Sequence, residues 1–108
     1  MPNVTISIDA TRMPPDENLA RLSRDCVELC THVLRAEVRN VHVIFLAVRH
    51  GHGHPVFADI RYRVGASRTP DVMNRFMEAL DQAIVRHTGL TARIRCFGYT
   101  ASNLHARN

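Results

Sequence analysis

The sequence predicts an α/β domain of 108 residues, with the element order β-α-β-β-α-β and a four-stranded sheet that carries two helices on one face. Three observations support this. Four short segments have the alternating or continuous apolar pattern of strands. Two longer segments repeat apolar residues at helical spacing. Finally, residues 2–48 and 56–99 follow the same strand, helix, strand layout, which indicates a structural repeat within a single domain spanning 1–108.

The first half contains an alternating strand, an amphipathic helix and an apolar strand. Residues Val4–Ile8 alternate apolar and polar side chains, as a half-buried strand does. The prolines of Met13–Asp16 open a helix. Its apolar stripe comprises Leu19, Leu22, Cys26, Leu29, Cys30 and Val33. Residues Val41–Val48 are apolar on both faces, so we expect both faces of this strand to be covered. Because two helices cover only one face of a small sheet, a second subunit is expected on the other.

The second half repeats this order. Residues Val56–Val64 alternate again, with the even-numbered positions facing the core. Thr69 and Pro70 are suited to the cap and first turn of a helix, and Gly89 is suited to its left-handed end. Residues Ala92–Tyr99 form the last strand. Each strand–helix–strand unit should join parallel strands by a right-handed crossover.

Arginine supplies all fourteen basic charges, since the chain has no lysine, and the net charge is +4. Its planar guanidinium matches carboxylates and phosphates, so an anionic partner is expected, either a small acid or a nucleic acid.

No apolar run reaches the length of a membrane span, and the first residues do not resemble a signal peptide. The three cysteines form no CxxC pair, which favours free thiols in a reducing, cytoplasmic compartment.

Four arginines are predicted to share the sheet face that lacks helices. Side chains two residues apart on a strand point the same way, so Arg61 and Arg63 share a face, as do Arg93 and Arg95. Such a group is repulsive unless anions or carboxylates lie between its members. It indicates an anion-binding face, with a solvated surface or interface salt bridges as the alternative.

Pro2 is the candidate catalytic residue. It follows the initiator methionine, and a small second residue favours removal of that methionine, which would leave a secondary amine at the N-terminus. An α-amino group has a pKa of about 8, and burial or neighbouring cations favour its neutral form. Such an amine could act as a general base near neutral pH.

Several motifs, in this order, resemble the tautomerase superfamily. They are the Met-Pro start, Val41-His-Val-Ile44, and the stretch from Ile94 to Asn103, the last two being similar to the macrophage migration inhibitory factor family. Arg12 lies ten residues after the proline, as in the 4-oxalocrotonate tautomerase family. The segment Arg63–Thr69 is similar to a motif of the cis-chloroacrylate dehalogenases.

The resemblance implies a homotrimeric isomerase, a keto–enol tautomerase that needs no metal or organic cofactor. Pro2 would be its general base, in active sites between subunits, and its substrate a small carboxylic acid. Arg63 and Arg95 are the main candidates for substrate contacts, and Arg12 and Arg68 are secondary. Arg61 and Arg93 would make the pocket more cationic than that of the migration inhibitory factor. Decarboxylase or hydratase chemistry on the same scaffold is left open.

The sequence is compatible with two other functions. A ferredoxin-like module that binds nucleic acid would share this element order. The first and third strands lack the aromatic signature typical of RNA recognition, because their only aromatic residues, Phe57 and Tyr62, lie on opposite faces. A tautomerase-like protein retained only for binding is the second.

The histidines of His50–His54 alternate with glycine, yet no nearby pair completes a zinc site, so we expect a plain loop.

Overall fold

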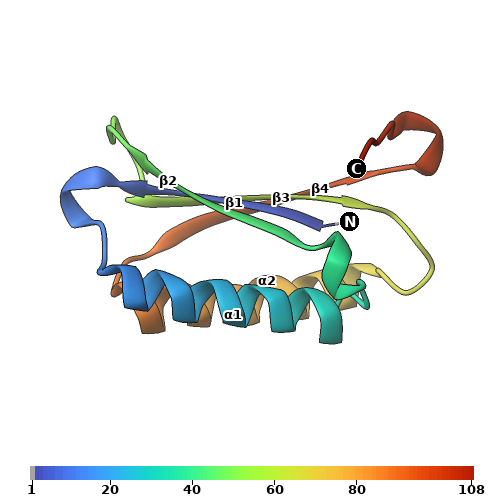
Figure 1. Cartoon of the computed structure of the whole chain (residues 1–108), viewed down its shortest axis with the longest axis horizontal. Coiled ribbons are helices and arrows are strands. Elements are labelled where there is room, and N and C mark those ends of the chain that lie inside the picture. Colours follow the sequence, from blue (N-terminus) through green and yellow to red (C-terminus); the bar gives the residue numbers. More distant parts are fainter. Residues whose placement is uncertain (1) are drawn as a thin grey trace.

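The computed structural model describes residues 2–108 as two layers, with a sheet covered on one face by two helices (Figure 1). The elements are β1 (Pro2–Asp9), α1 (Asp16–His32), β2 (His42–Val48), β3 (Val56–Arg63), α2 (Pro70–Thr88) and β4 (Ala92–Tyr99). Short 3₁₀ turns follow β1, precede β2 and follow β4. The predicted order and the placement of both helices on one face are confirmed. Within residues 2–108, no helix is both long and apolar enough to cross a lipid bilayer.

The strands are ordered β2-β1-β3-β4. Strand β1 runs parallel to β2 and antiparallel to β3, and β3 runs parallel to β4, so each half contributes one parallel pair as predicted. One register row contains Pro2, Tyr62 and Gly98. The start of β1 therefore lies beside the C-terminal ends of β3 and β4. We call this side, where these strand ends meet, the Pro2 end of the sheet.

Local sequence explains where the elements begin and end. Strand β1 starts at Pro2, earlier than predicted, and the first position of a strand tolerates a residue without a backbone N–H. Helix α2 begins as predicted, because the Thr69 side chain accepts a hydrogen bond from the backbone N–H of Val72. The helix ends at Gly89, whose φ of 69° is the left-handed conformation that glycine adopts most easily.

The core lies between the sheet and the helices. Its fully buried members include Val4, Ile6, Ile8, Leu22, Cys26, Cys30, Leu34, Val56, Ala58, Ile60, Phe76, Leu80 and Ile84. Leu22 and Cys26 come from α1 and Phe76 and Leu80 from α2, so both predicted helical stripes face the sheet.

The opposite, helix-free face of the sheet keeps large apolar side chains in solvent. Ile44 and Leu46 of β2 are 39% and 44% exposed, and Phe57 and Phe97 are 39% and 40% exposed. Val43 and Phe45, on the other side of β2, pack against the core. Strand β2 is thus apolar on both sides as predicted, and one of its sides is open in the single chain.

Candidate active site at the start of the first strand

Pro2 is the first residue of β1 and lies at the Pro2 end of the sheet, where β3 and β4 end. Its backbone pairs with that of Tyr62, and its ring is among the fully buried side chains. The start of β1 lies above the C-terminal end of α1 and close to the connection that leads from β3 into α2 (Figure 1). Met1 precedes Pro2 in the sequence and lies outside the described residues.

A pocket of about 300 Å³ opens at the Pro2 end of the sheet, and Pro2 itself is not among its walls. Its walls are Asn3, Arg61, Tyr62, Tyr99, Asn103 and Leu104. Asn3 follows Pro2 along β1, and Tyr62 faces Pro2 across the strand pair, so the pocket lies within one residue of the proline. It combines two phenol groups, two amides and one guanidinium, a set able to orient a small polar ligand.

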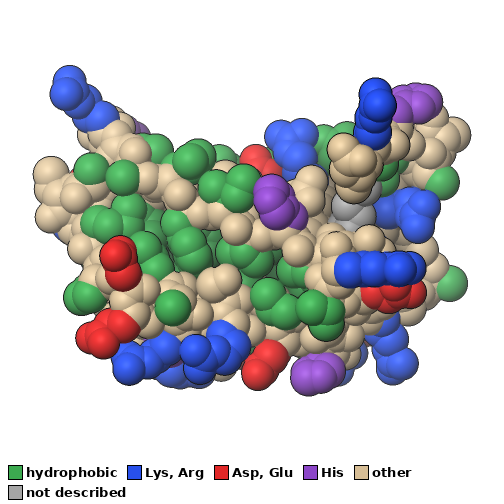
Figure 2. Space-filling view, viewed as in Figure 1, with side chains coloured by type: hydrophobic (Ala, Val, Ile, Leu, Met, Phe, Trp, Pro, Cys, Tyr) green, Lys and Arg blue, Asp and Glu red, His purple; other side chains and the backbone are tan. Residues whose placement is uncertain are grey.

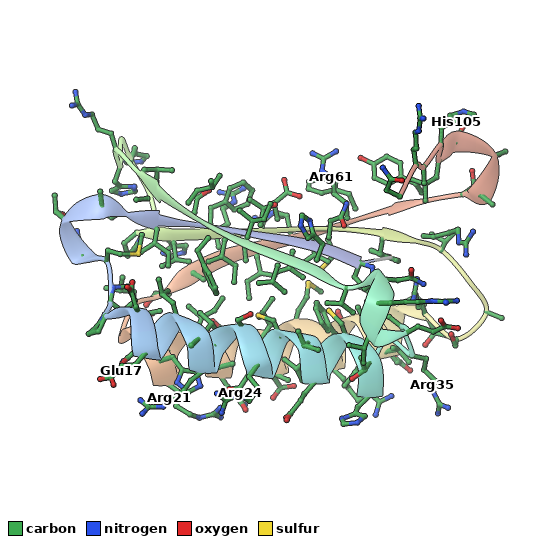
Figure 3. The ribbon with its side chains drawn as sticks, viewed as in Figure 1. Glu17, Arg21, Arg24, Arg35, Arg61 and His105 are labelled. Carbon is green, nitrogen blue, oxygen red and sulfur yellow. The ribbon has the colours of Figure 1, made fainter. Side chains whose placement is uncertain are left out.

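Arg61 is held from three sides in this pocket. Its Nε lies 3.2 Å from Oδ1 of Asp59, and its Nη1 donates a 2.7 Å hydrogen bond to the hydroxyl of Tyr99. Its guanidinium carbon lies 5.3 Å from the centre of the Phe97 ring. The hydrogen bond and charge of Asp59 raise the pKa of Arg61. Figure 3 shows Arg61 rising from the helix-free side of the sheet.

Arg68 links the same end of the sheet to α1. Its Nε donates to the carbonyl of Leu34 at 2.9 Å, and its Nη1 donates to the carbonyl of Arg63. Tyr62 is the residue paired with Pro2, and Arg63 directly follows it. The carbonyl that Arg68 contacts therefore lies one residue beyond that pair. The second terminal amino group of Arg68 has no acceptor within residues 2–108. Arg63 is exposed and forms no ion pair within these residues.

The other predicted arginines lie farther away in the single chain. All four of the β3 and β4 arginines are exposed, as the parity argument predicted. Arg95 is three residues from the row of Pro2 and Arg93 is five, or about 10 Å and 16 Å along the strand. Arg12 follows the opposite end of β1, where its Nε lies 3.3 Å from Asp9. Of the predicted arginines, only Arg61 and Arg63, which flank Tyr62, and Arg68, which bonds to Arg63, therefore lie at the Pro2 end of one chain.

Sequence reasoning missed Tyr99 and the pocket's two amide side chains. Tyr99 has the same strand parity as Arg95, so the face that it occupies could have been read from the pattern. Asn103 lies in the 3₁₀ turn after β4 and reaches the pocket because the chain turns back there. No periodic signal in the tail predicts that return.

A second hollow of about 480 Å³ adjoins the first and shares Asn3 and Leu104 with it. Its other lining residues are Arg39, Asn40, Val41, His42, His105, Ala106, Arg107 and Asn108. None of them is acidic, although Arg39 pairs at 2.9 Å with Glu37 nearby. Figure 2 shows basic and histidine side chains around this end of the molecule, to the right of the view. The C-terminal tail thus extends the polar surface beside Pro2.

The cysteines do not offer a nucleophile. Burial raises the pKa of Cys26 and of Cys30 to about 12, and that of Cys96 to about 11. All three are free thiols, and at neutral pH they are protonated and poorly reactive. Within residues 2–108, no group of three or more His, Cys, Asp or Glu side chains is placed to hold a metal ion.

Sequence comparison finds no matching family model and no significant match among curated proteins. Solved structures do match. Pt0534, crystallised after inactivation by 2-oxo-3-pentynoate, has a TM-score of 0.82 and 19% identity, covering 96% of this chain and 90% of its own. The macrophage migration inhibitory factor of Toxoplasma gondii has a TM-score of 0.78 and 15% identity, covering 96% and 95%.

A fused wild-type 4-OT, described as a symmetric trimer, gives a TM-score of 0.79 at 10% identity, covering 97% of this chain and 93% of its own. These structures belong to the tautomerase superfamily, and the alignments extend over nearly the whole of each chain. At such low identities the likeness concerns architecture. The chain therefore has the β-α-β-β-α-β fold of the tautomerase superfamily.

Proposed function

We propose that this protein is a cofactor-independent isomerase of the tautomerase superfamily, in which Pro2 is the general base after removal of Met1. The observation that carries the proposal is the position of Pro2, paired with Tyr62 at an edge that also holds Arg61, Arg63 and Arg68. Burial and nearby cations both disfavour a protonated amine. We therefore expect the Pro2 nitrogen to be neutral near pH 7 and able to accept a proton.

The reaction would be a proton transfer within a 2-oxo or enol acid. Pro2 would take a proton from a carbon next to the carbonyl group and return it elsewhere on the conjugated system. As the enolate develops, negative charge gathers on the carbonyl oxygen. Tyr99 could stabilise that charge, because it accepts a hydrogen bond from Arg61 and its own proton remains available to donate.

The substrate carboxylate would bind to Arg63 and to the uncommitted amino group of Arg68. Arg61 would hold Tyr99 in place, since its guanidinium is already engaged by Asp59. The adjoining hollow, with basic side chains and no acidic lining residue, favours a substrate with a second anionic group at its far end. We therefore propose a compact, doubly charged acid.

We further propose that the protein assembles as a homotrimer through the helix-free face. The exposed side chains of Ile44, Leu46, Phe57 and Phe97 support this, because such a patch on a small domain favours association. The likeness to a fused 4-OT described as a trimer supports it as well. In such an assembly Arg95 and Arg12, distant from Pro2 in their own chain, could contact the substrate of a neighbouring subunit.

The three free thiols support a reducing, cytoplasmic location.

The direct test is the activity of Pro2→Ala on a panel of 2-oxo acids. We expect turnover of the best substrate to fall by about 10²-fold or more, the scale for a positioned proton-transfer group. Arg75→Ala is the matched control, because Arg75 is exposed on α2, and it should leave turnover unchanged. A loss below tenfold in Pro2→Ala, with the fold intact, would rule out Pro2 as the base.

A further inference from the structure

A separate hollow of about 640 Å³ lies at the opposite end of the sheet from Pro2. It is lined by His50, His52, Gly53, His54, Phe57 and Arg93. Every ionisable side chain in its lining is a base, and none is a carboxylate. The β2–β3 connection that supplies the histidines rises beyond the strand ends, on the side away from the helices (Figure 1, green, left). The hollow is thus open and basic in the single chain, at the rim of the helix-free face, where it shares Phe57 with the apolar patch proposed for the trimer contact.

The histidine loop is held in a defined shape. Its far end is anchored by a 2.9 Å hydrogen bond from the backbone N–H of Asp9 to the carbonyl of Pro55. Within the loop, Nε2 of His50 lies 2.9 Å from the carbonyl of Gly53, whose φ is 91°. A carbonyl only accepts hydrogen bonds, so Nε2 of His50 carries the proton. When the ring is protonated, its Nδ1 becomes a second donor.

Arg93 and Phe57 form the sheet side of the hollow, next to each other in the register of β3 and β4. Within residues 2–108, no carboxylate lies within 4.0 Å of the Arg93 guanidinium. Its hydrogen-bonding fork therefore keeps its capacity for an anion. Arg93 is about 16 Å along β4 from the row of Pro2, so one small ligand does not span both places.

Two other charged side chains lie near His50. Arg49 precedes it and lines the neighbouring hollow together with Asp9. The Asp9 carboxylate would oppose an anion, but it accepts two hydrogen bonds from Thr11 and pairs with Arg12. The charge of Asp9 is thus already compensated.

From this arrangement we propose that the hollow is a second binding site, one that takes a compact phosphate-type oxyanion. Arg93 would bind two of its oxygens, and the imidazoles of His50, His52 and His54 would donate to the others. Histidine side chains ordinarily gain their proton below about pH 6.5. Binding is therefore expected to strengthen as the pH falls from 8 to 6. The site does not depend on the chemistry proposed for Pro2.

The test uses inorganic pyrophosphate as the probe, titrated into the whole protein at constant ionic strength while the histidine ring resonances are followed by NMR. We expect the rings of His50, His52 and His54 to shift at pH 6, with an affinity at least tenfold weaker at pH 8. Arg93→Ala and the double variant His52→Asn/His54→Asn should each weaken binding at least tenfold. Arg75→Ala and Pro2→Ala should bind as the parent protein does.

Three outcomes would overturn the proposal. They are the absence of saturable binding at pH 6, an unchanged affinity in Arg93→Ala, and shifts confined to His42 and His105 at the other end of the molecule. Turnover of 2-oxo acids by the double histidine variant is measured in parallel and is expected to be unchanged. A failure of the anion site and a failure of the Pro2 chemistry are thereby distinguished.

Discussion

The guanidinium of Arg61 donates a 2.7 Å hydrogen bond to the hydroxyl of Tyr99, across 38 residues of sequence. Asp59 holds the same guanidinium from its other side at 3.2 Å. Because the tyrosine oxygen accepts this bond, its proton remains free to be donated into the pocket next to Pro2. A carboxylate, a guanidinium and a phenol thus form a chain that ends at the pocket.

Removal of the Tyr99 hydroxyl should impair the chemical step. We expect Tyr99→Phe to lower kcat by about tenfold to 10²-fold, since the developing enolate loses a hydrogen-bond donor. Steady-state kinetics on the best 2-oxo acid would measure this, with circular dichroism as the check on folding. Asp59→Asn should have a smaller effect on kcat, because it loosens Arg61 without removing the phenol. An unchanged kcat in Tyr99→Phe would assign the hydroxyl a structural role.

The oligomeric state depends on the apolar side chains of the helix-free face. We expect the parent protein to elute with three times the 12.2 kDa mass of the chain in light scattering coupled to gel filtration. Leu46→Arg should shift it towards the monomer, because a charge would be buried in the contact. Val85→Arg is the matched control, since Val85 is 49% exposed on α2. A monomeric parent protein would contradict the proposed assembly.

The cysteines should be unreactive in the native protein. Burial raises the thiol pKa to about 12 for Cys26 and Cys30 and to about 11 for Cys96, so little thiolate forms at pH 8. A colorimetric disulfide reagent should therefore modify all three thiols only after denaturation in guanidinium chloride. Rapid, stoichiometric labelling of the folded protein at pH 8 would be inconsistent with this burial.

Asp9 should make stability depend on pH at the acidic end. Hydrogen bonds from Thr11 lower the pKa of the Asp9 carboxyl, and the charge of Arg12 contributes further. A carboxylate whose pKa is lowered by folding stabilises the native state above its unfolded pKa, about 3.9, and this is lost as the pH falls through the folded value. Asp9→Ala should thus lower the urea midpoint at pH 7 and approach the parent protein near pH 2. An equal difference at both values would exclude the ionised carboxylate as the cause.

Much of the fold could be predicted because it depends on patterns within single segments. Thr69, Pro70 and Gly89 define α2 through backbone requirements that only a few residue types meet. The alternation along β3 and β4 correctly assigned Arg61 and Arg93 to the helix-free face.

The composition of the site could not be predicted in the same way. Strand parity says which face a side chain occupies, but only the pairing of strands says which row it shares. The register places Arg95 beside Asp59 and Arg61 beside Phe97, so four arginines of one face divide between two ends of the sheet. The hydrogen bonds of Arg68 could not be predicted either, because they go to the backbone carbonyls of Leu34 and Arg63, which any residue type could supply.

Catalysis by Pro2 requires that its nitrogen is an unblocked and reactive amine. This requirement is tested most directly by the intact mass of the protein from its native host, before and after treatment with 2-oxo-3-pentynoate, the compound that inactivated Pt0534. We predict a starting mass that lacks Met1, followed by a single adduct per chain that maps to the N-terminal peptide beginning at Pro2 and forms much more slowly in Pro2→Ala. A starting mass that includes Met1, with no adduct on that peptide, would exclude Pro2 as the catalytic amine.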